Sequence, residues 1–257
     1  MPEGGSGLSY LIVANWKMNK TNQESLKLIT EINNAIQQTS NINVVICPPY
    51  TSIVPAAEVL ENSSIMLGSQ NMSHEAPGAH TGEISVDMIS PYCEYVILGH
   101  SERRIIYGET NDIVNMKILK ALGSKLTPII CIGENIDQRN EGKLDSILKE
   151  MLESSLTGVK SFDNLVIAYE PLWAIGTGIS ASPEQANEAC SKIKILLMEH
   201  FNKTEKDITT PILYGGSVTK ENIKDFLNQD CIDGALIGSA SLSSEQFLSI
   251  IQTIDTL

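Results

Sequence analysis

The segment LVIAYEPLWAIGTG, residues 165–178, joins a continuous apolar run to a loop that contains proline, tryptophan and two glycines. The run LVIA has no polar residue at alternate positions, so the strand that it predicts is apolar on both faces. Strands of this kind are typical of parallel sheets that are covered by helices. Glu170 follows the run directly. Its carboxylate could close a buried strand or take part in chemistry, and this segment alone does not decide between the two interpretations.

The same pattern occurs eight times along the chain, and helical periodicity follows each apolar run. The predicted strands are YLIVAN (10–15), INVVIC (42–47), IMLGSQ (65–70), YVILGH (95–100), TPIICIG (127–133), LVIAYE (165–170), PILYGG (211–216) and GALIGS (234–239). The clearest helix starts are Thr21 with Glu24, Ser182-Pro183 with Gln185, and Ser243 with Gln246. The second of these opens a helix whose predicted core stripe is Ala186, Ala189, Cys190, Ile193 and Leu197.

Eight strand and helix units without a linker or a shift in composition predict a single (β/α)8 barrel, with a doubly wound open sheet as the alternative. The 257 residues suit one barrel domain, which we place at residues 9–257. Residues 1–8 lack the cationic start of a secretory signal, and we interpret them as a flexible leader or a cloning scar. No segment approaches the ~18 continuous apolar residues of a membrane helix. We therefore expect a soluble protein without membrane partners.

Charge and cysteine content limit the possible functions. A net charge of −13 disfavours nucleic acid and anionic membranes as partners, and an anionic substrate would need a locally positive site. The 5 cysteines have no CxxC spacing, which argues against a disulfide framework or a zinc site and for a cytoplasmic location. His74 and His80 lie close together in the sequence, but nothing else with suitable spacing joins them, so we expect no metal.

Polar residues recur at the carboxyl ends of the predicted strands, where parallel architectures place their reacting groups. Lys17, His100, Glu102 and Glu170 follow the first, fourth and sixth strands, and a barrel would make them neighbours. Small residues follow the last two strands and could expose backbone N–H groups to a phosphate. These residues are Gly215, Gly216, Ser217, Gly238 and Ser239.

Together these segments resemble the triosephosphate isomerase family. The motifs that carry the resemblance are NWKMN (15–19), SQN (69–71), GAHTGEIS (78–85), LGHSERR (98–104), CIGE (131–134), YEPLWAIGTG (169–178), YGGSV (214–218) and GSASL (238–242). The resemblance covers the chain from residue 10 onward. It implies a glycolytic and gluconeogenic enzyme that interconverts dihydroxyacetone phosphate and D-glyceraldehyde 3-phosphate through an enediolate, without metal or organic cofactor, as a homodimer.

The resemblance also implies a role for each polar residue. Glu170 would be the base at carbon, and His100 the electrophile at the carbonyl, acting as a neutral imidazole whose pKa is lowered by a helix N-terminus, as is known for this family. Lys17 would hold the substrate anion and stabilise the enediolate. Glu102 would orient Lys17 and His100 or relay protons, and Asn15 would position Lys17 or donate to the substrate.

Two loops receive roles from the same resemblance. Pro171, Leu172 and Trp173 would form one hinge of a catalytic lid, with Ala174 and Ile175 at its tip and Gly176, Thr177 and Gly178 as the other hinge. Closure would bring the N–H of Gly176 to the phosphate. The loop at residues 71–84 would insert into a second copy of the chain and bring Thr81 to the partner's Asn15 and Glu102. Cys131 would pack against Glu170.

The resemblance has few departures, of which Ser239 is the one at the phosphate site, where the family usually has a second glycine. Two other functions stay open from the residues alone. The first is a different phosphate-binding barrel enzyme, which would lack the combination of Lys17, His100 and Glu170. The second is an inactive homologue with a binding or scaffold role, which the intact catalytic residues disfavour.

Overall fold

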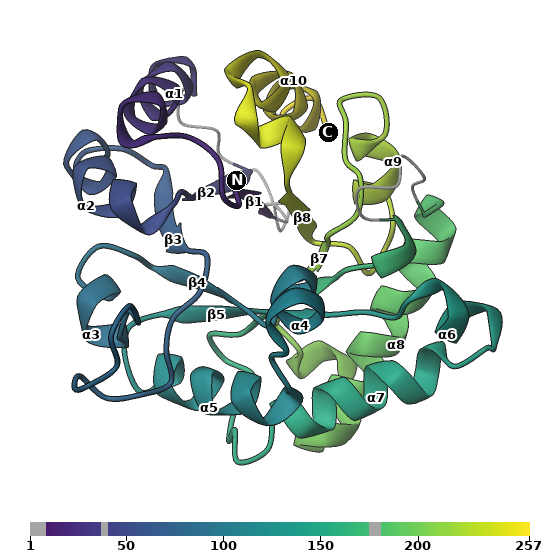
Figure 1. The fold of residues 1–257 in the computed structure, drawn as a ribbon. Coiled ribbons are helices and arrows are strands. Elements are labelled where there is room, and N and C mark those ends of the chain that lie inside the picture. The colour runs from purple at the N-terminus through teal and green to yellow at the C-terminus, as the bar shows by residue number, and fades with distance from the viewer. Residues whose placement is uncertain (1–8, 37–40, 175–180) are drawn as a thin grey trace, which may run out of the picture.

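The structure is a computed structural model and describes residues 9–36, 41–174 and 181–257. Its centre is a closed barrel of parallel strands in the order of the chain, from β1 to β8 (Figure 1). The strands are β1 (Tyr10–Asn15), β2 (Ile42–Cys47), β3 (Met66–Ser69), β4 (Tyr95–Leu98), β5 (Thr127–Ile132), β6 (Val166–Tyr169), β7 (Ile212–Tyr214) and β8 (Gly234–Ile237). Every predicted strand is present within its predicted range. The (β/α)8 barrel is confirmed, and the alternative of an open sheet is wrong.

Helices alternate with the strands, and most of them surround the barrel and cover its outer face (Figure 1). They are α1 (Asn22–Ala35), α2 (Tyr50–Val59), α3 (Val86–Ile89), α4 (Ser101–Tyr107), α5 (Asn111–Leu122), α6 (Ile136–Asn140), α7 (Leu144–Ser155), α8 (Pro183–Phe201), α9 (Ile223–Leu227) and α10 (Ser244–Ile254). Short 3-10 helices occur at η1 (Leu172–Ala174), η2 (Glu205–Asp207) and η3 (Ser239–Leu242). No helix in the described part of the chain is both long enough and apolar enough to cross a membrane.

The predicted helix starts are confirmed, with one difference. Thr21 caps α1 and Ser182 caps α8, each with the reciprocal bonds of a capping box. Ser243 caps α10 by accepting from the N–H of Gln246, but the Gln246 side chain does not return the bond. The predicted core stripe of α8 is buried, as expected from its spacing.

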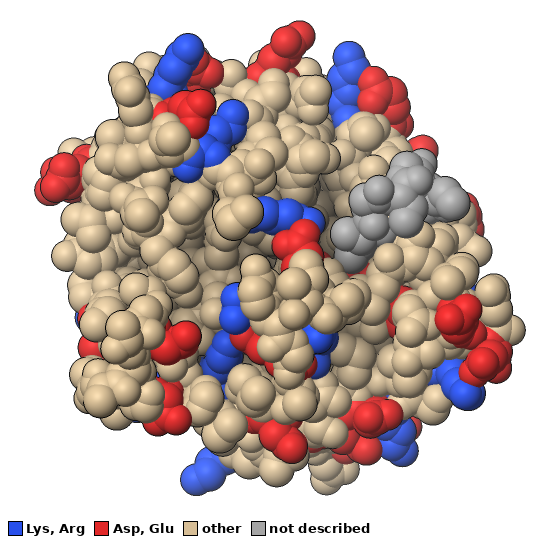
Figure 2. All heavy atoms as spheres, in the orientation of Figure 1, with Lys and Arg blue, Asp and Glu red and all other residues tan. Residues whose placement is uncertain are grey.

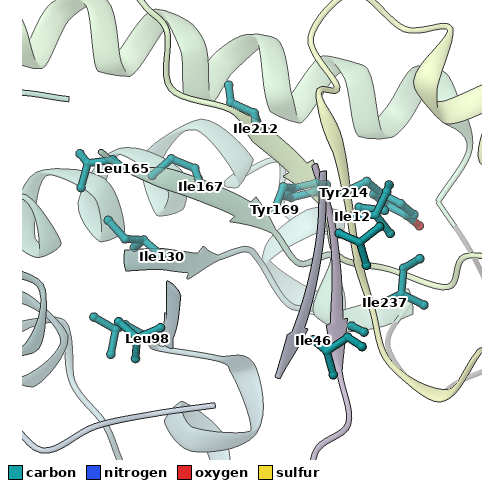
Figure 3. Packing of buried hydrophobic residues seen from close by; sticks show 14 of the residues in the cluster. Ile12, Ile46, Leu98, Ile130, Leu165, Ile167, Tyr169, Ile212, Tyr214 and Ile237 are labelled. Carbon is teal, nitrogen blue, oxygen red and sulfur yellow. The ribbon is translucent and has the colours of Figure 1, made fainter. Parts of the chain in front are cut away.

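The continuous apolar runs have a simple structural cause, because each strand has one face in the barrel and one toward the helices. In β1, Leu11 and Val13 belong to the cluster inside the barrel, whereas Ile12 and Ala14 belong to the cluster between strands and helices. Figure 3 shows part of this outer cluster, with isoleucine and tyrosine side chains of several strands packed together. Both faces are therefore out of water, and no polar alternation is possible.

The barrel closes where the first strand meets the last. Leu11 pairs with Gly234, and the register continues to Ala14 beside Ile237. A Cβ atom at residue 234 would lie 1.9 Å from the carbonyl oxygen of Leu11, so this seam requires a glycine. The closure brings the segments after β1 and β8 together, and both segments contribute to the site described next.

Candidate active site

A pocket of about 380 Å³ opens at the carboxyl ends of the strands. Figure 2 shows the hollow near the centre of this face, with acidic and basic side chains scattered around it. The pocket is lined by Asn15, Trp16, Lys17, Asn19, His100, Glu170, Gly215, Gly216, Ser217, Val218, Leu236, Ile237, Gly238, Ser239, Ala240 and Leu242. The structure thus brings together most of the predicted site residues. Glu102 does not line the pocket but contacts it through Lys17.

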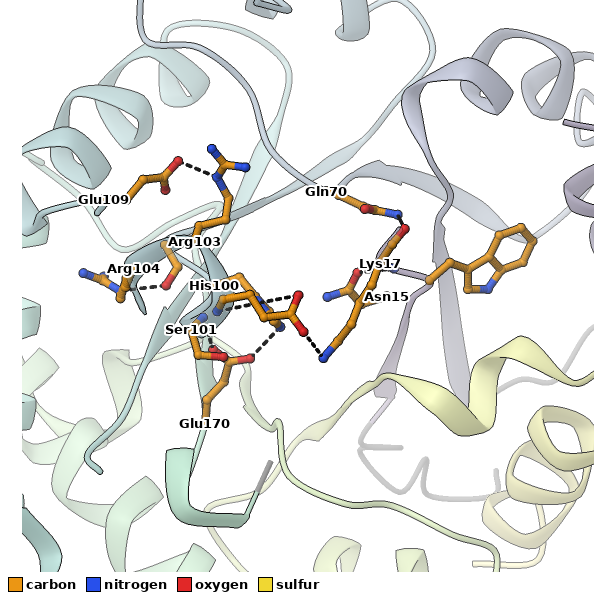
Figure 4. A network of polar contacts seen from close by, with 12 residues as sticks. Asn15, Lys17, Gln70, His100, Ser101, Arg103, Arg104, Glu109 and Glu170 are labelled. Atoms are coloured by element: carbon orange, nitrogen blue, oxygen red, sulfur yellow. Dashed lines mark hydrogen bonds and ion pairs between the residues drawn. The ribbon is translucent and has the colours of Figure 1, made fainter. Parts of the chain in front are cut away.

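Lys17 follows β1 and is held at both its backbone and its side chain. Its φ of 53° lies in the left-handed region, which residues other than glycine rarely adopt. Its N–H donates to Oδ1 of Asn15 at 3.1 Å. Its Nζ donates to Oε1 of Glu102 at 2.7 Å, and both side chains are partly exposed (Figure 4). The ammonium is therefore oriented by a carboxylate and remains accessible to an anion in the pocket.

His100 and Glu170 form a buried pair beside Lys17 (Figure 4). Oε1 of Glu170 lies 3.0 Å from Nε2 of His100, and Oε2 accepts from the backbone N–H of Ser101 at 2.9 Å. Burial raises the pKa of Glu170. The charge and hydrogen bond of His100, the bond from the Ser101 N–H and the charge of Lys17 lower this pKa by more than burial raises it, so the net pKa lies below its ordinary value. These contacts favour the ionised form of the Glu170 carboxyl.

The expected lowering of the His100 pKa is wrong for this arrangement. The N–H of Glu102, at the start of α4, donates to Nδ1 of His100 at 3.3 Å, and this bond favours a neutral imidazole, as predicted. Burial also lowers the pKa of His100, but the charge and hydrogen bond of Glu170 raise it more, with a net increase. The net increase in the pKa of His100 comes from its direct contact with Glu170. The predicted decrease rested on the helix N-terminus alone, without this contact.

The opposite wall of the pocket consists of the segments after β7 and β8. A Cβ atom at Gly216 would lie 2.2 Å from the hydroxyl oxygen of Tyr214, so a larger residue here would have to displace the ring of Tyr214. Ser239 begins η3 and is exposed, and it is not among the described residues with positive φ. The structure therefore explains how a serine fits where the family usually has glycine, because the backbone conformation needs no glycine.

Only the first part of the predicted lid is described. Pro171 leads into η1, and Nε1 of Trp173 donates to Oε1 of Glu134 at 2.9 Å. Ile175, Gly176, Thr177 and Gly178 lie outside the described residues, as do residues 1–8. The lid, the phosphate contact of Gly176 and the leader stay predictions.

The loop at residues 71–84 lies away from the pocket lining, with Thr81 exposed. Its contact with a partner stays a prediction. His74 and His80 both approach Glu75, with Nε2 to carboxylate oxygen distances of 3.2 and 3.9 Å. In residues 9–36, 41–174 and 181–257, no group of three or more histidine, cysteine, aspartate or glutamate side chains could hold a metal ion.

The sequence interpretation missed two polar residues that support the site. Nε2 of Gln70, after β3, donates to the carbonyl oxygen of Lys17 at 2.8 Å. Glu134, after β5, is fully buried and accepts hydrogen bonds from the hydroxyl of Tyr169 and the indole of Trp173 on either side of Glu170. Both residues stand at the ends of apolar runs, as Lys17 and His100 do, and this position is the sequence signal that marks them.

Comparison with known proteins gives a consistent result. The family model described as "Triosephosphate isomerase" matches residues 10–254. The protein named triosephosphate isomerase of Dehalococcoides mccartyi (strain CBDB1) is 45% identical over 240 residues, which are 93% of this chain and 94% of that protein. The protein of the same name from Dictyoglomus turgidum is 44% identical over 246 residues, 95% of this chain and 98% of that one. The protein of the same name from Carboxydothermus hydrogenoformans is 43% identical over 244 residues, which are 94% of this chain and 97% of that protein.

Proposed function

The chain belongs to the triosephosphate isomerase family, and we propose that the pocket between Lys17, His100 and Glu170 is its active site. The protein is an isomerase that interconverts dihydroxyacetone phosphate and glyceraldehyde 3-phosphate, a step of glycolysis. Family membership decides against a different phosphate-binding barrel enzyme. The presence of Lys17, His100 and Glu170 in one pocket disfavours an inactive homologue.

Glu170 removes a proton from the carbon next to the carbonyl of the substrate. Its lowered pKa keeps it ionised, and its two donors, His100 and the Ser101 N–H, hold it ready at the pocket wall. To act as a base, the carboxylate has to leave these donors for the substrate carbon. That movement also removes the contact that raises the pKa of His100, which favours the neutral imidazole suited to donate a hydrogen bond to the substrate oxygen.

Lys17 stabilises the negative charge that develops on the substrate oxygen as the enediolate forms. It is the only lysine or arginine among the described residues that line the pocket of this strongly acidic protein. The Asn15 side chain supports its backbone, and Glu102 orients its ammonium. The proton taken by Glu170 returns to the neighbouring carbon, and His100 moves the hydroxyl proton between the two oxygens, so that no proton is lost.

The phosphate of the substrate binds to the backbone N–H groups of the segments after β7 and β8. The pocket-lining positions of Ser217, Gly238 and Ser239 support this proposal, because their small side chains leave the backbone accessible. Gly176 would add a further N–H from the lid.

We also propose a cytoplasmic homodimer. Several large apolar side chains near the active-site face are exposed, among them Met18 at 95%, Ile105 at 70% and Ile106 at 66%. Such a group of exposed apolar side chains is typical of an interface. Thr81 of the loop at 71–84 would reach the partner's Asn15 and Glu102. The five cysteines are free, which supports a reducing location.

The observation that carries the proposal is the position of Glu170, ionised and buried beside His100 and Lys17. Replacing Glu170→Asp withdraws the carboxylate by about one methylene and should lower kcat by at least ~100-fold without loss of the fold. The measurement is a coupled assay with glyceraldehyde 3-phosphate and no added metal. Glu58→Asp, at an exposed position of α2, is the matched control and should behave as wild type. Activity of Glu170→Asp within threefold of wild type would contradict this assignment.

A further inference from the structure

The left-handed backbone of Lys17 requires support from outside its own segment. This conformation costs a residue with a side chain about 1–2 kcal/mol. The bond from the Lys17 N–H to Asn15 is local. The long-range support is Gln70, whose Nε2 donates to the carbonyl oxygens of Lys17 at 2.8 Å and of Cys47 at 2.9 Å. Figure 4 shows the side chain of Gln70 next to the backbone of Lys17, with a dashed line for the bond to its carbonyl oxygen. The position of Lys17 therefore depends on what fixes Gln70.

Asn71, the next residue, connects this segment to the helices outside the barrel. Its carbonyl oxygen accepts from Oγ of Ser69 at 2.6 Å and from the hydroxyl of Tyr50 at 2.5 Å. Its side-chain Oδ1 accepts from Nζ of Lys117, on α5, at 2.8 Å. Three contacts from three elements thus fix one residue. The contact from Lys117 is the only one of these that carries charge.

Lys117 is nearly completely buried, with 4% of its surface exposed. Its Nζ lies 2.5 Å from Oε1 of Glu109, and the same oxygen accepts from Nε of Arg103 at 2.5 Å. Arg103 is on α4, directly after Glu102, which holds the ammonium of Lys17. A buried lysine is unfavourable unless it is well paired, so this cluster is fixed in place. It is connected to both members of the ion pair in the active site.

We propose that Lys117 is a positioning residue for the isomerase reaction, which acts on Lys17 through Asn71 and Gln70. Through Glu109 and Arg103 the same ammonium also steadies the start of α4, which carries Glu102. The buried ammonium of Lys117, outside the barrel, thereby helps to set the distance between Lys17 and Glu102. The inference rests on the proposed function of Lys17.

The test uses Asn71→Ala, which removes the acceptor for Lys117 and leaves the pairing of Lys117 with Glu109 in place. The probe is 2-phosphoglycolate, whose phosphate and carboxylate require the ammonium of Lys17. We expect the dissociation constant of this inhibitor to rise about fivefold, as for the loss of one hydrogen bond. Asn71→Asp keeps an oxygen acceptor for Lys117 and should restore binding to within about twofold of wild type. Lys120→Met, at a half-buried position on the same helix as Lys117, is the control and should leave binding unchanged.

A double-mutant cycle separates positioning from general loosening. In the background of Lys17→Ala, Asn71→Ala should weaken the inhibitor no further, because its effect passes through Lys17. Additive effects, or equal losses in Asn71→Ala and Asn71→Asp, would overturn the inference. So would a loss that accompanies a change in molecular mass by sedimentation, because assembly would then be the cause. If Lys17→Ala itself binds the inhibitor as wild type does, the proposed function of Lys17 fails instead.

Discussion

Lys17 combines two requirements at a single residue. Its ammonium has to meet the substrate anion, which needs a lysine, and its backbone is left-handed, which favours glycine. The chain keeps the lysine and supports the unfavourable backbone with Asn15 and Gln70. Unfavourable backbone conformations of this kind are found at functional sites when the surrounding structure fixes them.

This conflict predicts the effect of substitutions at Lys17 on stability. Lys17→Gly should have a free energy of unfolding about 0.5–1 kcal/mol higher than Lys17→Ala, because both lack the ammonium and only alanine is strained at positive φ. Urea unfolding at fixed protein concentration measures the difference. At Lys27, within α1, the order of the two stabilities should reverse: the free energy of unfolding of Lys27→Gly should be about 1 kcal/mol lower than that of Lys27→Ala. Equal stabilities of the two variants at residue 17 would show that the left-handed backbone is not retained.

The pairing of His100 with Glu170 gives stability a defined pH dependence. The pKa of Glu170 is lowered from 4.5, so its contribution is lost as pH falls through the folded-state pKa. The pKa of His100 is raised from 6.5, so its contribution is lost as pH rises through the folded-state value. Between these limits the electrostatic contributions of both groups favour the folded protein.

We therefore expect the difference in free energy of unfolding between wild type and Glu170→Gln to be largest between about pH 4.5 and 6.5. The difference should decrease on both sides of this window. Chemical unfolding in a series of buffers, with both proteins at the same concentration, measures it. A difference that does not change from pH 4 to pH 9 would mean that the two groups are not coupled.

At the scale of elements, the ends of β5 and β6 come unusually close. A Cβ atom at Gly133, after β5, would lie 1.8 Å from the carbonyl oxygen of Glu170. The N–H of Glu170 also donates to the carbonyl oxygen of Ile132. The position of the catalytic carboxylate thus depends on the absence of a side chain on the neighbouring strand.

Two glycine substitutions separate this effect from simple loss of stability. Gly133→Ala and Gly234→Ala introduce similar clashes with a strand backbone and should each destabilise the protein by at least about 2 kcal/mol. Only Gly133→Ala should also lower kcat, by roughly tenfold or more, because it displaces Glu170. Steady-state kinetics below the unfolding transition of both variants measures the second effect. Equal kcat values in the two variants would show that the contact at Gly133 is structural only.

The elements show why some features could be predicted from sequence and others could not. The strands were predicted because both their faces are buried, which leaves an apolar run such as that of β6 with little ambiguity. Lys17, His100 and Glu170 were found because parallel strands place their carboxyl ends on one face. The left-handed φ of Lys17 could not be predicted, since part of its support comes from Gln70, a residue far away in the chain. In the sequence, Lys117 and Glu109 look like ordinary surface charges. Only the structure shows that they are buried and paired with each other.

At the scale of the whole molecule, the proposed dimer can be tested at the loop of residues 71–84. Thr81→Arg should weaken association and activity together, because the inserted loop would have no room for a long cation beside the partner's Asn15. Sedimentation and the coupled assay measure the two effects on the same samples. Glu153→Arg, at an exposed position of α7, adds the same side chain elsewhere and should leave both unchanged. A fully active dimer or a fully active monomer of Thr81→Arg would refute the coupling.

The seam between β1 and β8 also affects how the protein can be made in the cell. Leu11 leaves the ribosome early, but its partner Gly234 is synthesised more than two hundred residues later. At roughly 5–20 residues per second, one edge of β1 stays unpaired on the order of ten seconds or longer. During translation the nascent chain therefore exposes an apolar strand edge that could pair with other chains. The closed barrel has no such edge, so this aggregation hazard ends only when β8 has paired with β1.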